Sequence, residues 1–207
     1  MAALGRSLAA QRDTMLRVLR TERGFSLLEI LIVVGLIGIV SGIAVPTLTA
    51  AADRMKLGQT AREVERELQT AKARAVGKRR PIRVRFNCPT IGEYRLVELI
   101  GTPAVPVAAD SAADRCSEAA YPFPAPDLDA VTRPNLDGPL RRLEPTVTFA
   151  IAPTIEFWPD GTAHHDTGAG DPWPMIPVVG VNIRLAREGA ISTITVNGLG
   201  KVLLQTN

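Results

Sequence analysis

An apolar run of 21 residues, Phe25 to Val45, contains a single ionisable side chain, Glu29. About 20 apolar residues are enough to cross a bilayer as a helix, so the run predicts a membrane-spanning helix over 25–45. A carboxylate inside such a span is costly and usually serves a function. Glu29 is therefore a candidate functional residue. The alternative is an acid that reaches the membrane surface from a plain anchor.

The residues before this run form an arginine-rich leader, 1–24, with Met15 as an alternative start. The leader holds five arginines and two acids, which accounts for the whole net charge of +3. The rest of the chain has 19 basic and 19 acidic residues, so its net charge does not indicate a nucleic-acid binder. Basic residues ahead of the span predict a cytoplasmic N-terminus and an exported C-terminal part.

The junction between Gly24 and Phe25 has the character of a processing site. A secretory signal is cut after its apolar core, whereas this junction precedes the core. Cleavage here would therefore remove the leader and keep the anchor.

The helical pattern resumes after Pro46, where proline either kinks a helix or begins a segment. Apolar residues then recur at spacings of three and four, which predicts an amphipathic helix over 46–77. Gly77 is the expected C-cap, and Pro81 prevents continuation. The residues of this apolar stripe are Leu57, Ala61, Val64, Leu68, Ala71 and Ala75.

Beyond the helix, residues 78–207 have the period of strands. Residues 82–86 alternate apolar side chains with Arg83 and Arg85, which predicts a half-buried strand. A second strand is expected over 93–100, with a bulge where the alternation slips at Leu96-Val97. A long irregular insertion is expected over 101–145. Further strands are expected at 147–151, 155–157, 179–185, 190–197 and 201–205.

These elements predict an α+β fold in which one long N-terminal helix packs on antiparallel β-sheet through its apolar stripe. The exported part contains two cysteines, Cys88 and Cys116. An even number permits one disulfide in an oxidising compartment, and two free, partly buried thiols are the alternative.

A basic cluster lies where the helix gives way to the first strand, at Lys78, Arg79, Arg80, Arg83 and Arg85. It is a candidate phosphate-binding patch. The alternative is a solvated helix end whose cations complement the helix dipole.

No metal site, cofactor or catalytic residue is expected. His164 and His165 are adjacent, which makes them a poor metal pair, and a solvated turn is the preferred interpretation. Asp166 and Asp171 are too few and too irregularly spaced for a calcium loop. The sequence also lacks the common nucleophile, phosphate-loop and zinc-protease motifs, so a membrane-anchored enzyme is the least supported alternative.

The sequence Gly24-Phe25-Ser26-Leu27-Leu28-Glu29, the apolar run and Pro46 resemble the N-terminus of type IV pilins and type II secretion pseudopilins. The resemblance implies cleavage after Gly24 by a membrane prepilin peptidase, followed by N-methylation of Phe25. It also implies that the subunit moves from the membrane into a filament built around such helices, with Glu29 and Pro46 as assembly residues. The implied partners are other pilins or pseudopilins, the prepilin peptidase and methyltransferase, and an inner-membrane assembly platform.

Cleavage would create a free amine on Phe25 at the positive end of the helix dipole. Glu29 lies one turn further along and could meet this amine or that of a neighbouring subunit. Pairing between subunits would fix their axial register.

Looser motifs over 57–204 are similar to the GspH/FimT group of minor pseudopilins: residues 71–76, 155–161 and 194–198. This resemblance implies a minor pseudopilin at or near the tip of a periplasmic type II secretion pseudopilus. The alternative is a minor pilin of a type IV pilus or competence pseudopilus, including one that contacts DNA. The Gly-Arg-x-Arg element of DNA-binding FimT-type proteins is replaced here by Gly200-Lys201-Val202-Leu203, which argues against nucleic-acid contact.

Overall fold

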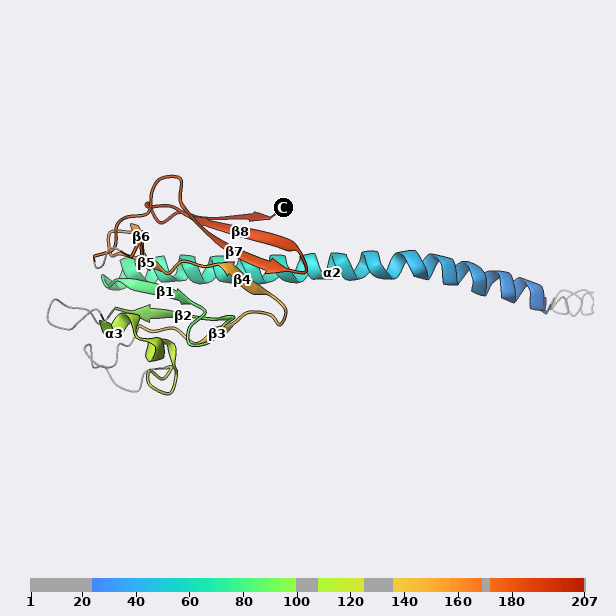
Figure 1. Ribbon diagram of the computed structural model, residues 1–207, viewed down its shortest axis with the longest axis horizontal. Coiled ribbons are helices and arrows are strands. Elements are labelled where there is room, and N and C mark those ends of the chain that lie inside the picture. The colour runs from blue at the N-terminus through green and yellow to red at the C-terminus, as the bar shows by residue number, and fades with distance from the viewer. Residues whose placement is uncertain (1–23, 100–107, 125–135, 169–171, 207) are drawn as a thin grey trace, which may run out of the picture. The chain divides into compact units, whose positions relative to one another are not determined.

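The computed structural model describes residues 24–99, 108–124, 136–168 and 172–206. The chain divides into two compact units with a boundary between Thr49 and Ala50. One helix, α2 (Leu27–Lys78), contributes to both units (Figure 1). The fold is the expected α+β type, with a long N-terminal helix and antiparallel sheets that pack on its second part. Residues 1–23 of the leader, and therefore Met15, lie outside the described residues.

In the N-terminal unit, α2 continues through Pro46, so no new helical segment begins there. Proline has no amide hydrogen and cannot donate to the preceding turn. The next residue adds a bond in the same region, because the Thr47 hydroxyl donates to the Ala44 carbonyl at 2.8 Å.

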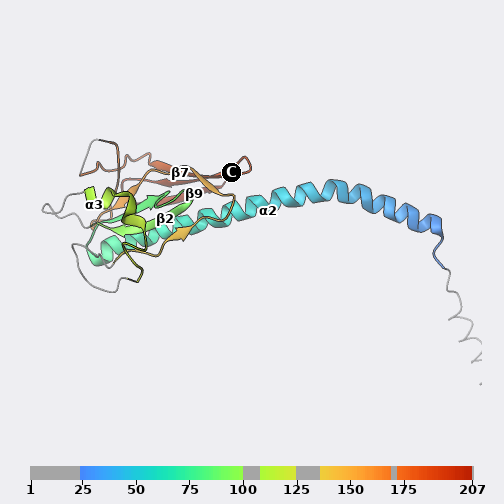
Figure 2. The same cartoon turned by 60° about the horizontal axis from the view of Figure 1, so that its bottom comes forward.

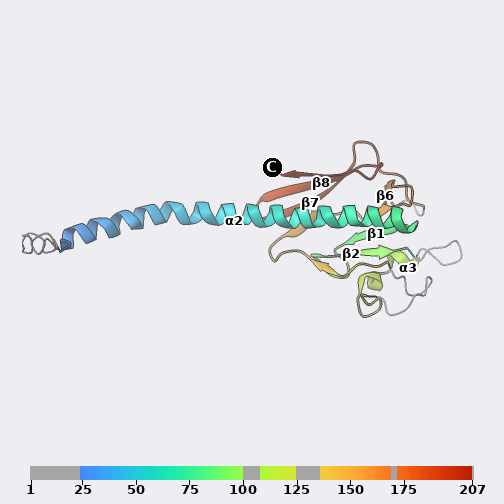
Figure 3. The ribbon, with the colours of Figure 1, turned by 180° about the vertical axis from the view of Figure 1, so that it is seen from behind.

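In the globular unit, α2 packs through the predicted apolar stripe, and all six residues of that stripe are buried in the main core. Strands from two sheets complete this core (Figure 1). Seen from behind, α2 runs in front of strands of both sheets (Figure 3). The stripe prediction is therefore confirmed.

The first sheet has the order β3-β2-β1-β5-β6 and the second has the order β4-β7-β8-β9. All pairings between these strands are antiparallel. The strands are β1 (Ile82–Phe86), β2 (Glu93–Glu98), β3 (Arg141–Arg142), β4 (Thr148–Ile151), β5 (Ile155–Phe157), β6 (Ala163–His165), β7 (Val181–Arg187), β8 (Ala190–Val196) and β9 (Val202–Thr206).

The helix end differs from the prediction, because Gly77 is still helical. The left-handed residue is Arg79, with φ 54°, and the Arg80 amide donates to the Ala75 carbonyl at 3.2 Å. That bond belongs to the Schellman motif, whose left-handed position is usually glycine. The prediction of Gly77 as the C-cap was therefore wrong by two positions.

Strand β2 has no bulge, because its pairing with β1 runs without a shift from Ile82↔Glu98 to Phe86↔Tyr94. All six residues of β2 are buried. The apolar alternation slips at Leu96-Val97 because both faces of the strand are covered, not because the backbone is irregular.

The insertion predicted to be irregular contains ordered elements where it is described. These are α3 (Ala108–Ser111), the 3-10 helix η1 (Ala113–Cys116) and β3. Both α3 and η1 lie beside β2 (Figures 1 and 2). Residues 100–107 and 125–135 lie outside the described residues. No periodic pattern marks this stretch, because these short elements are held by polar side chains of the sheet instead of by an apolar face.

Candidate functional site

The N-terminal segment begins its helix at a residue suited to that place. The Ser26 carbonyl accepts a hydrogen bond from the Ile30 amide at 3.2 Å, so Ser26 occupies the N-cap position of α2. Glu29 lies in the first turn, three residues after Ser26. A serine followed three residues later by glutamate is the capping-box pattern, which stabilises a helix start. The pattern gives Glu29 a second candidate role that sequence reasoning missed, although the spacing Ser-x-x-Glu was there to find it.

The apolar side chains of this segment are uncovered in the N-terminal unit. Every residue from 24 to 43 is exposed, including Phe25 at 77% and Leu28 at 66%. Within the described ranges, α2 is the one helix long and apolar enough to cross a membrane. A helix that is apolar on all sides needs an apolar environment, either lipid or other helices.

Three glycines of this segment follow one another at spacings of three and four: Gly35, Gly38 and Gly42. A Cβ placed on any of them would meet nothing within 4 Å. Small residues at such spacing let two apolar helices approach closely in a membrane. The segment therefore has a narrow face that permits close helix packing as well as a carboxylate in its first turn.

The five residues of the predicted basic cluster do not form one patch in the structure. Arg83 is buried, its Nη2 lies 2.8 Å from Glu156 Oε2, and its guanidinium stacks 3.7 Å from the Trp173 ring centroid. Arg80 Nη1 lies 2.6 Å from Glu98 Oε1.

Arg85 donates to backbone carbonyls, among them that of Ala112 at 2.5 Å. Burial, together with the neighbouring Arg83 and Arg115, lowers the pKa of Arg85. Lys78 and Arg79 are exposed at the helix end. Three of the five cations are therefore exposed, one of them paired with Glu98, and the other two bind protein groups.

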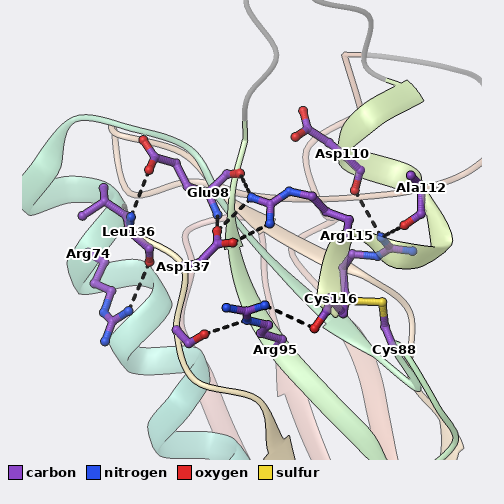
Figure 4. A network of polar contacts seen from close by, with 12 residues as sticks. Arg74, Cys88, Arg95, Glu98, Asp110, Ala112, Arg115, Cys116, Leu136 and Asp137 are labelled. Atoms are coloured by element: carbon purple, nitrogen blue, oxygen red, sulfur yellow. Dashed lines mark hydrogen bonds and ion pairs between the residues drawn. A yellow bond between two sulfur atoms is a disulfide. The ribbon is translucent and has the colours of Figure 1, made fainter. Parts of the chain in front are cut away.

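Cys88 and Cys116 are joined in a disulfide, with Cα atoms 5.6 Å apart (Figure 4). The sequence had left this open. The bond connects the loop after β1 to the end of η1, which places η1 against β2.

Four charged residues form a buried network next to this disulfide (Figure 4). Arg115 pairs with Asp137, with Nη2 to Oδ1 at 2.8 Å, and its Nη2 also donates to the Glu98 carbonyl at 2.7 Å. Arg95 donates from Nε to the Gly138 carbonyl at 2.7 Å and from Nη1 to the Cys116 carbonyl at 3.2 Å. Burial lowers the pKa of Arg95. No periodic sequence signal marks this network, because its members come from segments far apart in the chain.

The interpretation of His164 and His165 as a solvated turn was wrong. Both lie in β6, and His164 is buried. The His164 ring stacks on Trp158 with centroids 4.1 Å apart, and its two nitrogens lie 2.8 Å from the Trp173 carbonyl and 2.9 Å from Thr162 Oγ1. The two histidines have side chains on opposite faces of the strand, which does not make a metal pair.

Asp166 Oδ1 accepts a hydrogen bond from the Gly168 amide at 2.7 Å, and Asp171 lies outside the described residues. Among the residues that the structure describes, no group of three or more histidine, cysteine, aspartate or glutamate side chains is placed to hold a metal ion.

Comparison with known proteins identifies the N-terminal segment. Residues 19–45 match the family described as the prokaryotic N-terminal methylation motif. This match confirms the resemblance predicted from the sequence that begins at Gly24. No curated protein sequence matches the chain significantly.

Two solved structures are also similar, both of the type IV minor pilin FimU of Pseudomonas aeruginosa, in different crystal forms. The first is 16% identical, covers 72% of this chain and 91% of FimU, and has a TM-score of 0.40. The second is 14% identical, covers 74% of this chain and 90% of FimU, and has a TM-score of 0.43.

Proposed function

We propose that this chain is a type IV pilin-like filament subunit that is cleaved between Gly24 and Phe25 and methylated on Phe25. The observation that carries the proposal is the methylation-motif match over residues 19–45. The exposed apolar side chains of residues 24–43 support it, because a filament subunit must leave lipid and then bury the same surface against neighbouring helices.

In this proposal Glu29 acts after cleavage, as the charge partner of the new Phe25 amine. The new amine of Phe25 lies at the positive end of α2, and a carboxylate one turn away is its natural counter-charge. An unpaired charge costs free energy in an apolar filament core. Glu29 would therefore bind the amine of a neighbouring subunit and hold that subunit at one axial position. The chain itself needs no catalytic residues, because the peptidase and methyltransferase act on it.

Within this class we assign the chain to the minor pseudopilins of a type II secretion system, at or near the tip of the filament. The support is the set of GspH/FimT-like motifs at 71–76, 155–161 and 194–198. It would be anchored in the inner membrane with an extracytoplasmic globular unit, and its partners would be other filament subunits and the assembly platform. Deleting the chain and measuring exoprotein release, twitching and DNA uptake separates this assignment from a type IV pilus or competence role.

The class itself is tested by the N-terminus of the full chain extracted from membranes of cells with an active prepilin peptidase. Intact mass and N-terminal sequencing should show methylated Phe25 as the first residue. Gly24→Val is the informative variant, because a Cβ at Gly24 would meet nothing within 4 Å and the segment itself tolerates it. The variant should keep its leader. An intact leader on the wild-type chain would contradict the proposal.

A further inference from the structure

Residues 108–121, which we call the cap, cover the outer face of β1 and β2. This face carries Arg83 and Arg85 on β1 and Arg95 and Val97 on β2, because the register pairs Arg83 with Val97 and Arg85 with Arg95. The cap lies on it through α3 and η1 (Figure 4). Its central residues, Arg115 and Cys116, are fully buried.

The apolar contact beneath the cap is very small. Apart from the main core, the described residues contain one further buried apolar cluster, and it consists of Cys88, Val97 and Cys116. Two of its three members are the disulfide itself. A segment of this size cannot be held by the hydrophobic effect of one valine, since burial of one such side chain offsets the ordering of only one or two residues.

The remaining contacts of the cap are polar. Arg85 donates to the Ala112 carbonyl at 2.5 Å, Arg95 donates to the Cys116 carbonyl at 3.2 Å, and Arg115 pairs with Asp137. Each of these bonds replaces bonds to water, and each guanidinium also loses its hydration, so their net gain is small against the entropy lost when the cap is ordered. Docking also leaves Arg95 Nη2 and Arg115 Nε buried without a partner among the described residues, which opposes it.

We propose that the cap docks only when the Cys88–Cys116 disulfide is closed, as a local unit that can leave while the rest of the globular unit stays folded. The compartment in which this happens rests on the proposed function. In the reducing cytoplasm the cap would be undocked, and it would dock after export to an oxidising compartment.

The chemistry is a thiol–disulfide exchange with a disulfide-bearing oxidant. One thiolate attacks a sulfur of the oxidant and releases the first oxidant thiol. The second thiolate attacks the mixed disulfide and releases the second. Two electrons and two protons pass from the cysteines to the oxidant. In the docked state Cys88 is 5% exposed and Cys116 is 0% exposed, so the oxidant must act before the cap is seated.

Hydrogen exchange followed by mass spectrometry on the detergent-solubilised full chain tests this. The double variant Cys88→Ser/Cys116→Ser should lose protection over 108–121 on the order of 100-fold, the usual effect of removing such a link. Protection over 57–76 and 181–196 should stay as in the unmodified chain. Val97→Ala is the matched control, because it trims the same cluster but keeps the disulfide, and its cap should stay protected.

Three results would overturn the proposal. The cap could remain protected in the double variant, the reference segments could lose protection together with the cap, or Val97→Ala could release the cap equally. None of these depends on leader cleavage, which is read separately from the N-terminal mass of the same sample.

Discussion

Arg187 at the end of β7 donates from both Nε and Nη2 to a single oxygen of Asp53 on α2, at 3.1 and 2.7 Å. Arg187 is 8% exposed, whereas the side chain of Asp53 is 33% exposed. The pair therefore joins the second sheet to the first turns of α2 in the globular unit, and it does so with a cation that has little access to water.

Removing the aspartate should leave that cation buried without its counter-charge. We expect Asp53→Ala to lower the free energy of unfolding by about 2 kcal/mol, below the full effect of breaking a buried pair because Asp53 is partly exposed. Guanidinium unfolding followed by tryptophan fluorescence measures this, since Trp158 and Trp173 both lie in the globular unit.

The neighbouring Arg54 provides the control, because it is exposed on the same turn. Arg54→Ala should change stability by less than about 0.5 kcal/mol. The double variant Asp53→Ala/Arg187→Met should recover part of the loss, since it removes the unpaired charge. Equal effects of Asp53→Ala and Arg54→Ala would show that the pair contributes nothing.

Two substitutions at the end of α2 distinguish the observed cap at Arg79 from the predicted cap at Gly77. The two caps imply changes in stability of opposite sign. Because Gly77 is inside the helix and a Cβ there would meet nothing within 4 Å, Gly77→Ala should stabilise the globular unit by about 0.5–1 kcal/mol. Arg79→Gly should stabilise it by a similar amount of about 0.5–1 kcal/mol, because Arg79 has φ 54°. The same unfolding experiment measures both. If Gly77 were the cap, both substitutions would destabilise.

The parts of the fold that were predictable are those whose periodicity reports a single covered face. The stripe from Leu57 to Ala75 has the 3.6-residue period because one side of α2 meets the sheets and the other meets solvent. The strand at 82–86 was found from its alternating apolar residues on the core side, although its other face is covered as well.

The parts that were missed depend on covers that lie far away in the sequence. Arg83 was expected on a solvated face, but its partner Glu156 lies 73 residues further along the chain. The apparent irregularity of β2 has the same origin, because the cap on its outer face comes from the insertion. Local periodicity does not report that a distant segment covers the second face of a strand, so polar residues on that face are predicted to be exposed.

The candidate site, in contrast, could be identified largely from the sequence. The Gly24–Phe25 junction and Glu29 could be identified from the sequence because the segment is linear and its motif is contiguous. The position of Ser26 as N-cap was also readable from the spacing, yet only the hydrogen bond from Ile30 to its carbonyl made it evident.

Tyr94 provides a prediction about pH. Its hydroxyl is buried without a hydrogen-bond partner among the described residues, and its ring packs against Phe86 and Phe149. Burial, with Glu63 and Glu67 nearby, raises the pKa of Tyr94. Tyr94→Phe should therefore be neutral or stabilise the protein by up to about 1 kcal/mol at neutral pH, because it removes an unsatisfied polar group.

The sign of the pH effect follows from the raised pKa. Above about pH 10 the unfolded chain releases the phenolic proton while the folded chain keeps it, so stability falls as pH rises. The phenylalanine variant lacks this contribution. Its stability relative to the unmodified chain should therefore increase between pH 8 and about pH 11, measured by guanidinium unfolding at both values. A difference that stays constant with pH would contradict the burial of this hydroxyl.

Glu29 can act as a helix cap or as the charge partner of the Phe25 amine, and two substitutions separate these roles. Glutamine can still make a capping-box hydrogen bond but has no charge, whereas alanine can do neither. If the charge matters, as we propose, Glu29→Gln and Glu29→Ala should both reduce incorporation into filaments on the order of 10-fold or more, since an unpaired amine remains in an apolar core.

Incorporation is measured by crosslinking to other filament subunits in cells that contain the whole assembly system. The N-terminal mass of each variant must show normal cleavage, so that loss of incorporation is not loss of processing. Wild-type incorporation of Glu29→Gln beside a defect in Glu29→Ala would instead assign Glu29 to the helix cap.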